Sequence, residues 1–369
     1  MWKIWKEEFY KIASRRTVWL GLFLLLAFVS FRLYSECNTY TAVIGGKVLR
    51  GREAIRKDQE LTRLYAGDLT LDKISQIYEE YGFFYYDMDD KTRMGNFCNQ
   101  FITMRFTNYM QTDGNAPEDI HFLEDREWEG HAARLKDSPP RFDYIYGWDD
   151  FSEMYITCLI VVFILLIIGL APIFAEEYQL KTADILRTTR RGKKSGIWMK
   201  ILAAISFSAI LTCGVSAYLA GIYLAAYGTQ GLDASAILLT NLTSYYGYCP
   251  ETILMTFIMI ALLGLISSVL LAALVSCISA LCKSPFPALV ISLAGFLAPV
   301  LWVKILAPMQ ILGATLTRMV SHFMVSMPVY LPVSTGFAFS KEQIVLHLYI
   351  ALTAGTCGIL LGYRRYRNA

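Results

Sequence analysis

Side chains that could perform acid–base, nucleophilic or metal chemistry are present, but their spacing matches no familiar catalytic pattern. No histidine pair has the HExxH spacing of a zinc-protease helix. Cys277 and Cys282 are five residues apart, which does not fit a CxxC metal or redox site. The chain also lacks a GxSxG nucleophile elbow. We therefore expect a protein that is not an enzyme and that itself holds no metal or cofactor.

A nucleotide-binding loop is not indicated either. Gly192-Lys193 is a glycine–lysine pair, but Arg187 stands where the first glycine of a phosphate loop would be, and Lys194 replaces its Ser or Thr. The apolar segments contain few ionisable residues, whereas ion-driven transporters usually carry charges inside the helix bundle. If this protein moves a substrate, we expect a partner protein to supply the energy.

The elements that must position any site are long apolar segments. The 369-residue chain is 55% hydrophobic and only 18% charged. About 20 apolar residues are needed to span about 30 Å of hydrocarbon as a helix. Six stretches reach or approach this length, and they lie at 17–34, 152–175, 199–226, 252–281, 286–306 and 344–363. We therefore expect an all-α polytopic membrane protein with six transmembrane helices, the first retained as an anchor because no small-x-small cleavage site follows it.

The distribution of charge predicts the orientation. Basic residues gather in the first 16 residues, in segment 176–200 and in the tail 364–369. Six spans place all three on one side, which the positive-inside rule makes the cytoplasm, so both termini lie inside. Segment 35–151 then faces outward, and it holds 22 of the 31 acidic residues and 14 basic ones, a net charge of −8.

The N-terminal segment 1–16 has the pattern of an amphipathic helix. Trp2, Trp5, Phe9 and Ile12 recur at spacings of three, four and three, with lysines between them. Such a helix would lie among the lipid headgroups. The alternative is a plain cytoplasmic extension of the first span.

Segment 35–151 is predicted to be an extracytoplasmic, α-rich domain between the first and second spans. Two stretches, roughly 50–66 and 70–81, read as helices. Cys37 and Cys98 both fall on the outer side, where a disulfide could form, although two cysteines alone are weak evidence.

Small residues recur along the later spans in 199–363 and would let two helices approach closely. These rows fit packing within one subunit and a contact between subunits equally well. Segment 307–340 is apolar but interrupted by Gly and Pro, so we expect it to lie outside or re-enter without spanning. The rows contain Gly264, Ser268, Ala272 and Ser276 in the fourth span and Ala354, Gly358 and Gly362 in the sixth.

The link 176–198 is the most informative segment. Glu176 and Glu177 are expected to begin a short surface helix, and Arg187, Arg190 and Arg191 to end it, which suits the helix dipole. A rigid charged helix connected to two spans could transmit the movement of a cytoplasmic partner to the membrane helices.

Here the sequence resembles the ABC-2 family of ABC transporter permeases. In that family the second span ends in a Phe-x-x-Glu-type motif. A Gly/Thr-containing stretch, a leucine, a Thr/Ser-Pro-x-x-Arg-like turn and a lysine that opens the third span follow. This sequence departs from the pattern at Lys181, where Gly is common, and at Thr189, where Pro is common. The matching residues are Phe174, Glu177, Thr182, Leu186, Thr188, Arg190 or Arg191, and Lys200.

The resemblance implies a transmembrane subunit without its own ATPase, in which ATP binds to a separate ATP-binding subunit. Two permease subunits, identical or different, would pair with two such subunits, and 176–191 would be the coupling helix. It implies export of a peptide, lipid-like or other amphipathic compound across a cell membrane, in the first place the bacterial cytoplasmic membrane. Membrane lipid is the other expected partner, and nucleic acid is not. The alternative function is a non-transporting sensor or scaffold whose outer domain binds a ligand.

Overall fold

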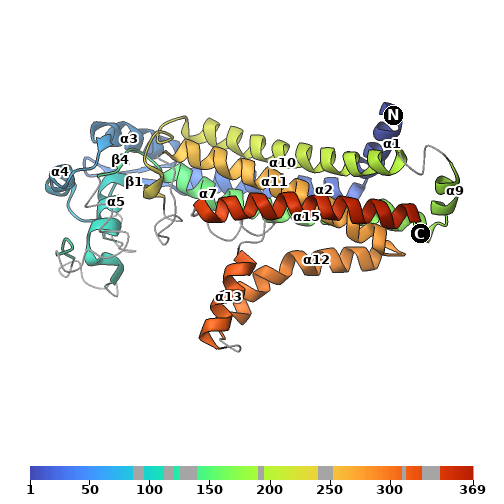
Figure 1. The fold of residues 1–369 in the computed structure, drawn as a ribbon. Coiled ribbons are helices and arrows are strands. Elements are labelled where there is room, and N and C mark those ends of the chain that lie inside the picture. The colour runs from blue at the N-terminus through green and yellow to red at the C-terminus, as the bar shows by residue number, and fades with distance from the viewer. Residues whose placement is uncertain are drawn as a thin grey trace. The chain divides into compact units, whose positions relative to one another are not determined.

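The computed structural model describes residues 1–85, 95–111, 120–124, 139–189, 195–239, 252–309, 313–325 and 341–368 (Figure 1). Its elements are mostly helices. Four of them are long and apolar enough to cross a membrane: Arg16–Thr39, Tyr146–Gln179, Ile197–Tyr227 and Ile253–Leu281. The protein is thus a mostly helical, membrane-embedded, multi-pass protein. The six-span count and the orientation stay predictions.

The chain forms two compact units. Unit 1 contains Met1–Phe28, Met154–Leu219 and Ile258–Ala369, and unit 2 contains Val29–Glu153 and Ala220–Phe257. Unit 2 therefore includes the whole of the predicted outer domain and, in addition, a stretch from later in the chain.

The helices that belong wholly or partly to unit 1 follow the predicted segments closely. Their bounds are α1 Trp2–Ala13, α2 Arg16–Thr39, α7 Tyr146–Leu170, α8 Pro172–Gln179, α9 Ala183–Thr188, α10 Ile197–Tyr227, α11 Ile253–Leu281, α12 Pro285–Leu301, α13 Ala314–Val325 and α15 Lys341–Asn368.

The N-terminal helix is confirmed as α1, and it is separate from α2 because the chain leaves the helical path at Ser14 and Arg15. The predicted aromatic row forms a stack. The Trp2 and Trp5 rings lie 4.5 Å apart, and the Trp5 and Phe9 rings 5.2 Å apart. The Phe9 ring then packs 6.0 Å from that of Phe207 on α10. A simple continuation of the first span is therefore not what forms, and the location among headgroups stays a prediction.

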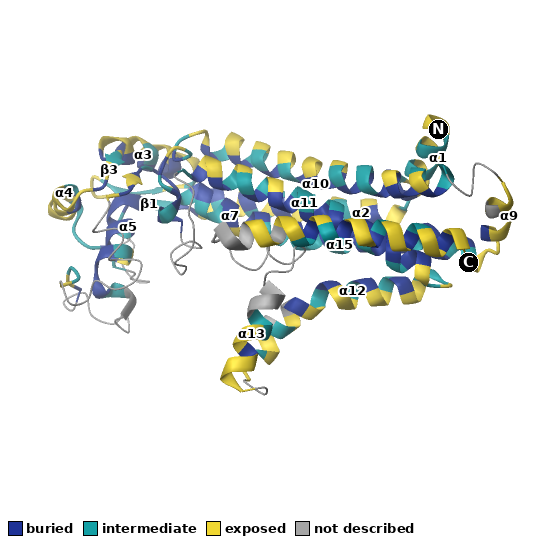
Figure 2. Cartoon of the chain, viewed as in Figure 1, coloured by how far each residue is buried: buried dark blue, intermediate teal, exposed yellow. Residues whose placement is uncertain are grey.

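The small residues of α11 and α15 pack helices of the same chain together. A methyl group added at Gly264 would lie 3.1 Å from the side chain of Leu159 on α7. One added at Gly362 would lie 3.2 Å from the Cα of Cys277 on α11, and one at Gly358 would lie 3.4 Å from Leu274. Within the two rows, Ser268, Ala272 and Ser276 are buried and Ala354 is half-buried. Figure 2 shows that α15 carries both buried and exposed residues along its length. The rows thus pack helices within one chain, and a contact between subunits stays a prediction.

The fifth predicted span, 286–306, is divided. Helix α12 contains Pro299 near its end, and a short π-helix, Trp302–Leu306, follows it. Proline removes a backbone donor and crowds the preceding turn, which accounts for the change of helix type. Helix α13 has 12 residues, too few to span a membrane. Much of the predicted segment 307–340 lies outside the described residues, so its non-spanning placement stays a prediction. Helix α15 covers the sixth predicted span.

Unit 2 contains the two predicted helices, as α3 Gly51–Leu64 and α4 Leu71–Tyr81, together with α5 Phe97–Phe106. It also contains short strands that the sequence analysis did not foresee. Strand β1 Thr41–Ile44 pairs antiparallel with β2 Lys47–Arg50, and β3 Gly67–Asp68 with β4 Arg141–Phe142. Gly45 and Gly46, both with positive φ, form the two-residue turn of the first hairpin. Short 3-10 helices lie at Asn108–Gln111 and Ala236–Leu238.

The core of unit 2 is built around a buried carboxylate. Asp58 is fully buried, accepts a hydrogen bond of 2.6 Å from the Tyr40 hydroxyl, and takes the Phe97 N–H at 3.0 Å on both oxygens. Desolvation raises the pKa of Asp58 to about 6, and the two donors only partly offset it.

The alternative of a disulfide between Cys37 and Cys98 is wrong in this structure, because both thiols are free and buried. The Cys98 thiol lies 3.6 Å from the Thr62 hydroxyl, and the Cys37 thiol 3.8 Å from the Tyr227 hydroxyl. Each thiol thus contacts a different hydroxyl group and not the other cysteine.

Asp58→Asn should remove a pH dependence of stability. The folded pKa lies above the usual value of 3.8, so the folded unit binds this proton more tightly than the unfolded chain. The resulting stability is present below about pH 4 and is lost as the pH rises through about 6, by roughly 3 kcal/mol. Thermal unfolding of the purified protein between pH 4 and 7 measures this slope. The control Asp72→Asn, at an exposed carboxylate of the same unit, should keep it; an unchanged slope in Asp58→Asn contradicts the prediction.

Gly362→Leu should destabilise unit 1 by about 1–3 kcal/mol, because the new side chain meets the backbone of α11. Gly214→Leu on α10 is the control, since an added methyl there has no atom within 4 Å. The Gly214→Leu protein should be as stable as the unaltered protein or slightly more stable, because leucine has a higher helix propensity than glycine. Melting temperatures in detergent separate the two, and equal losses in both variants would argue against tight α11–α15 packing.

Candidate functional site

The site begins where α7 passes into α8. Pro172 stands at the start of α8 and has no N–H to donate. Ser279 on α11 restores the hydrogen bonding there: its hydroxyl donates to the Ala171 carbonyl at 2.6 Å and accepts from the backbone N–H groups of Phe174 and Ala175 at 3.0 Å. In a membrane segment a freed backbone group needs such a partner. The serine thereby fixes the path of the chain into α8.

A buried ion pair joins α8 to α10. The ammonium of Lys200, a residue 4% exposed, contacts one carboxylate oxygen of Glu177, a residue 9% exposed. The other Glu177 oxygen accepts a hydrogen bond from the Tyr366 hydroxyl of α15. Glu8 of α1 supplies a second carboxylate, 3.9 Å from Lys200. Four helices therefore meet at one pair of opposite charges.

Aromatic rings enclose this pair. The ring of Phe174 lies 4.8 Å from that of Tyr366. The Lys200 nitrogen lies 5.4 Å from the centre of the Phe174 ring and 5.7 Å from that of Tyr366, within cation–π range. Burial of both residues places the charges in a medium of low dielectric, which strengthens their attraction.

The acidic pair does not begin a new helix, contrary to expectation. Glu176 and Glu177 occupy the last turn of α8, where the helix dipole disfavours negative charge. Ion pairs compensate: Glu176 binds Arg15 at 2.6 Å, and Glu177 binds Lys200. The predicted single helix is in fact two helices, α8 and α9, because these long-range contacts fix the end of α8.

A tight turn separates α8 from α9. Among the residues in the described ranges, Lys181 is the non-glycine residue with positive φ, at 56°. This left-handed region costs an ordinary residue about 1–2 kcal/mol and favours glycine. The Thr182 hydroxyl lies 3.4 Å from the Glu177 carbonyl and ties the turn to the end of α8.

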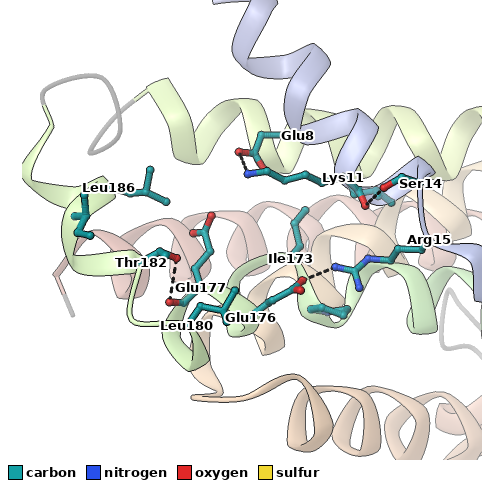
Figure 3. A pocket seen from close by; sticks show the side chains of 13 residues that line it. Glu8, Lys11, Ser14, Arg15, Ile173, Glu176, Glu177, Leu180, Thr182 and Leu186 are labelled. Atoms are coloured by element: carbon teal, nitrogen blue, oxygen red, sulfur yellow. Dashed lines mark hydrogen bonds and ion pairs between the residues drawn. The ribbon is translucent and has the colours of Figure 1, made fainter.

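Helix α9 presents apolar side chains to its surroundings. Leu180 is 64% exposed, Ile185 68% and Leu186 37%. The turn and α9, together with α8 and α1, enclose an open cavity of about 630 Å³ (Figure 3). Its polar wall contains the Arg15–Glu176 pair and the Lys11–Glu8 pair, and its apolar wall contains Leu180, Ile185 and Leu186.

The structure brings together most of the predicted coupling residues. Phe174, Glu177 and Lys200 meet in the buried cluster, and Glu176, Thr182 and Leu186 line the adjacent cavity. Arg190 and Arg191 lie outside the described residues.

Sequence reasoning missed Tyr366, Ser279, Arg15 and Glu8. Tyr366 sits in a basic tail and Ser279 among small helix residues, so neither carried a local signal.

Comparison of the chain with protein-family models, with curated proteins and with solved structures gives no match. Function is therefore inferred from the residues and their geometry.

Lys200→Met should destabilise unit 1 by about 3–5 kcal/mol, because Glu177 would then be buried without its cation. The double variant Lys200→Met/Glu177→Gln should recover much of this loss, since no lone charge remains. Melting temperatures of the two single variants and the double variant form the test. Additive losses would show that the two side chains are not coupled.

Proposed function

We propose that this chain is the transmembrane permease subunit of an ATP-driven ABC transporter of the ABC-2 type. The observation that carries the proposal is the convergence of Phe174, Glu177 and Lys200. These residues support the resemblance in sequence, and 23 positions separate Glu177 from Lys200. They meet in one buried cluster that joins the helices before and after the short α9, which is the arrangement that a coupling segment needs.

The turn before α9 supports the same proposal. The family favours glycine at the position of Lys181, and this residue has φ 56°, in the region that glycine adopts most easily. The departure of the sequence from the family pattern at this position therefore leaves the backbone shape of the turn in place.

The mechanism follows from how α9 is held. Helix α8 continues from α7, its last turn is bound to α10 and α15 through Glu177, and Arg15 holds Glu176. A force applied at α9 would thus reach several helices together. A separate ATP-binding subunit that prefers one arrangement of these helices when it holds ATP would shift the permease between two states.

The docking surface would be the apolar side of the turn and α9. Leu180, Ile185 and Leu186 are exposed, and all three line the open cavity beside α1. We propose that they seat in a groove of the ATP-binding subunit, and that two permease subunits pair in the full transporter. The chain would have six spans with both ends in the cytoplasm of a bacterial cell, and it would export a peptide, lipid-like or other amphipathic compound.

Leu186→Asp should abolish stable association with an ATP-binding subunit, because a charge replaces an apolar docking contact. Co-purification with a co-expressed ABC ATP-binding subunit measures it, and at least a tenfold loss of bound partner is expected. Leu64→Asp is the matched control, since Leu64 is 79% exposed and belongs to unit 2.

Both variants should keep the melting temperature of the unaltered protein. If the Leu186→Asp protein binds the partner as well as the unaltered protein and supports the same ATP turnover, α9 is not the coupling helix. If the unaltered protein itself binds no ATP-binding subunit, the transporter proposal is overturned in favour of a sensor or scaffold.

A further inference from the structure

The end of the last helix packs against the coupling segment. Tyr366 is 2% exposed although it is the fourth residue from the C-terminus. Its ring contacts Phe174 at 4.8 Å and Tyr178 at 5.5 Å, both on α8. One turn earlier, the Tyr363 ring lies 5.4 Å from Trp198 on α10. The last turns of α15 thus contact the helices on both sides of α9.

The Tyr366 hydroxyl contributes something that its ring cannot. A carboxylate has two oxygens, and Lys200 contacts only one of those of Glu177. The hydroxyl donates to the other oxygen. With both oxygens held from different helices, the carboxylate cannot rotate about its terminal bond without breaking one contact. Glu177 is therefore fixed in position, and with it the last turn of α8 from which the turn and α9 emerge.

We propose that Tyr366 is a positioning residue of the coupling site: its hydroxyl fixes Glu177, and the C-terminal helix thereby becomes part of the machinery that α9 drives. The positional role depends only on the geometry of unit 1. Its consequence for ATP-driven transport rests on the proposed function. A purely structural residue would act through its ring, so replacing tyrosine by phenylalanine separates the two roles.

Hydrogen exchange tests the positional role in the full-length protein in detergent. In Tyr366→Phe, the backbone amides of 172–189 should exchange about tenfold faster, because a hydrogen bond to a buried charge is lost while the ring contacts remain. Tyr363→Phe is the matched control, since among the described residues its hydroxyl makes no hydrogen bond. Exchange should be unchanged there. Unchanged exchange in Tyr366→Phe, or an equal increase in both variants, overturns the proposal.

Binding and ATP turnover in the complex with the ATP-binding subunit test whether Tyr366 takes part in coupling. Tyr366→Phe should bind that subunit as tightly as the unaltered chain, but the change in ATP turnover that the unaltered permease causes should fall at least threefold. If the unaltered chain binds and alters turnover, and Tyr366→Phe does the same to the same extent, a coupling role for Tyr366 is excluded while the transporter proposal stands. If the unaltered chain does not bind, the transporter proposal fails, and the exchange result alone decides the positional role.

Discussion

The ion pair between Glu177 and Lys200 is the constraint on which unit 1 depends. Neither charge can be buried alone without a penalty of several kcal/mol, so the two residues must meet. Because Glu177 ends α8 and Lys200 lies near the start of α10, their meeting closes the link that carries α9. Tyr366 and Glu8 complete the cluster from α15 and α1.

The apolar helices obey a second constraint, the need to satisfy backbone groups away from water. Pro172 has no N–H to donate at the start of α8. The Ser279 hydroxyl of α11 hydrogen-bonds the nearby Ala171 carbonyl and Phe174 N–H instead. Gly358 and Gly362 bring α15 against α11, where larger side chains would meet the backbone or its neighbours. Packing of small residues replaces the hydrophobic driving force that lipid does not provide.

Unit 2 buries a carboxylate by a different route. Asp58 has Tyr40 and the Phe97 N–H as donors, and these are neutral groups. Desolvation therefore raises its pKa to about 6, because these neutral donors only partly offset the loss of hydration. Glu177, by contrast, has a lysine against it. The two units thus bury a carboxylate in different ways, with neutral hydrogen-bond donors in unit 2 and an opposite charge in unit 1.

The sequence by itself determined the apolar helices, the amphipathic α1 and the helices α3 and α4, and it picked out Phe174, Glu177 and Lys200, which the structure brings together. Each of these is encoded locally, by hydrophobic runs, by periodicity or by a short motif. Only the tertiary structure decided that Glu176 and Glu177 end a helix, that Cys37 and Cys98 stay apart, and that Tyr366 reaches Glu177 across 189 positions. These outcomes depend on which distant groups contact a buried charge or thiol. A local sequence pattern cannot predict such contacts, because they form between residues far apart in the chain.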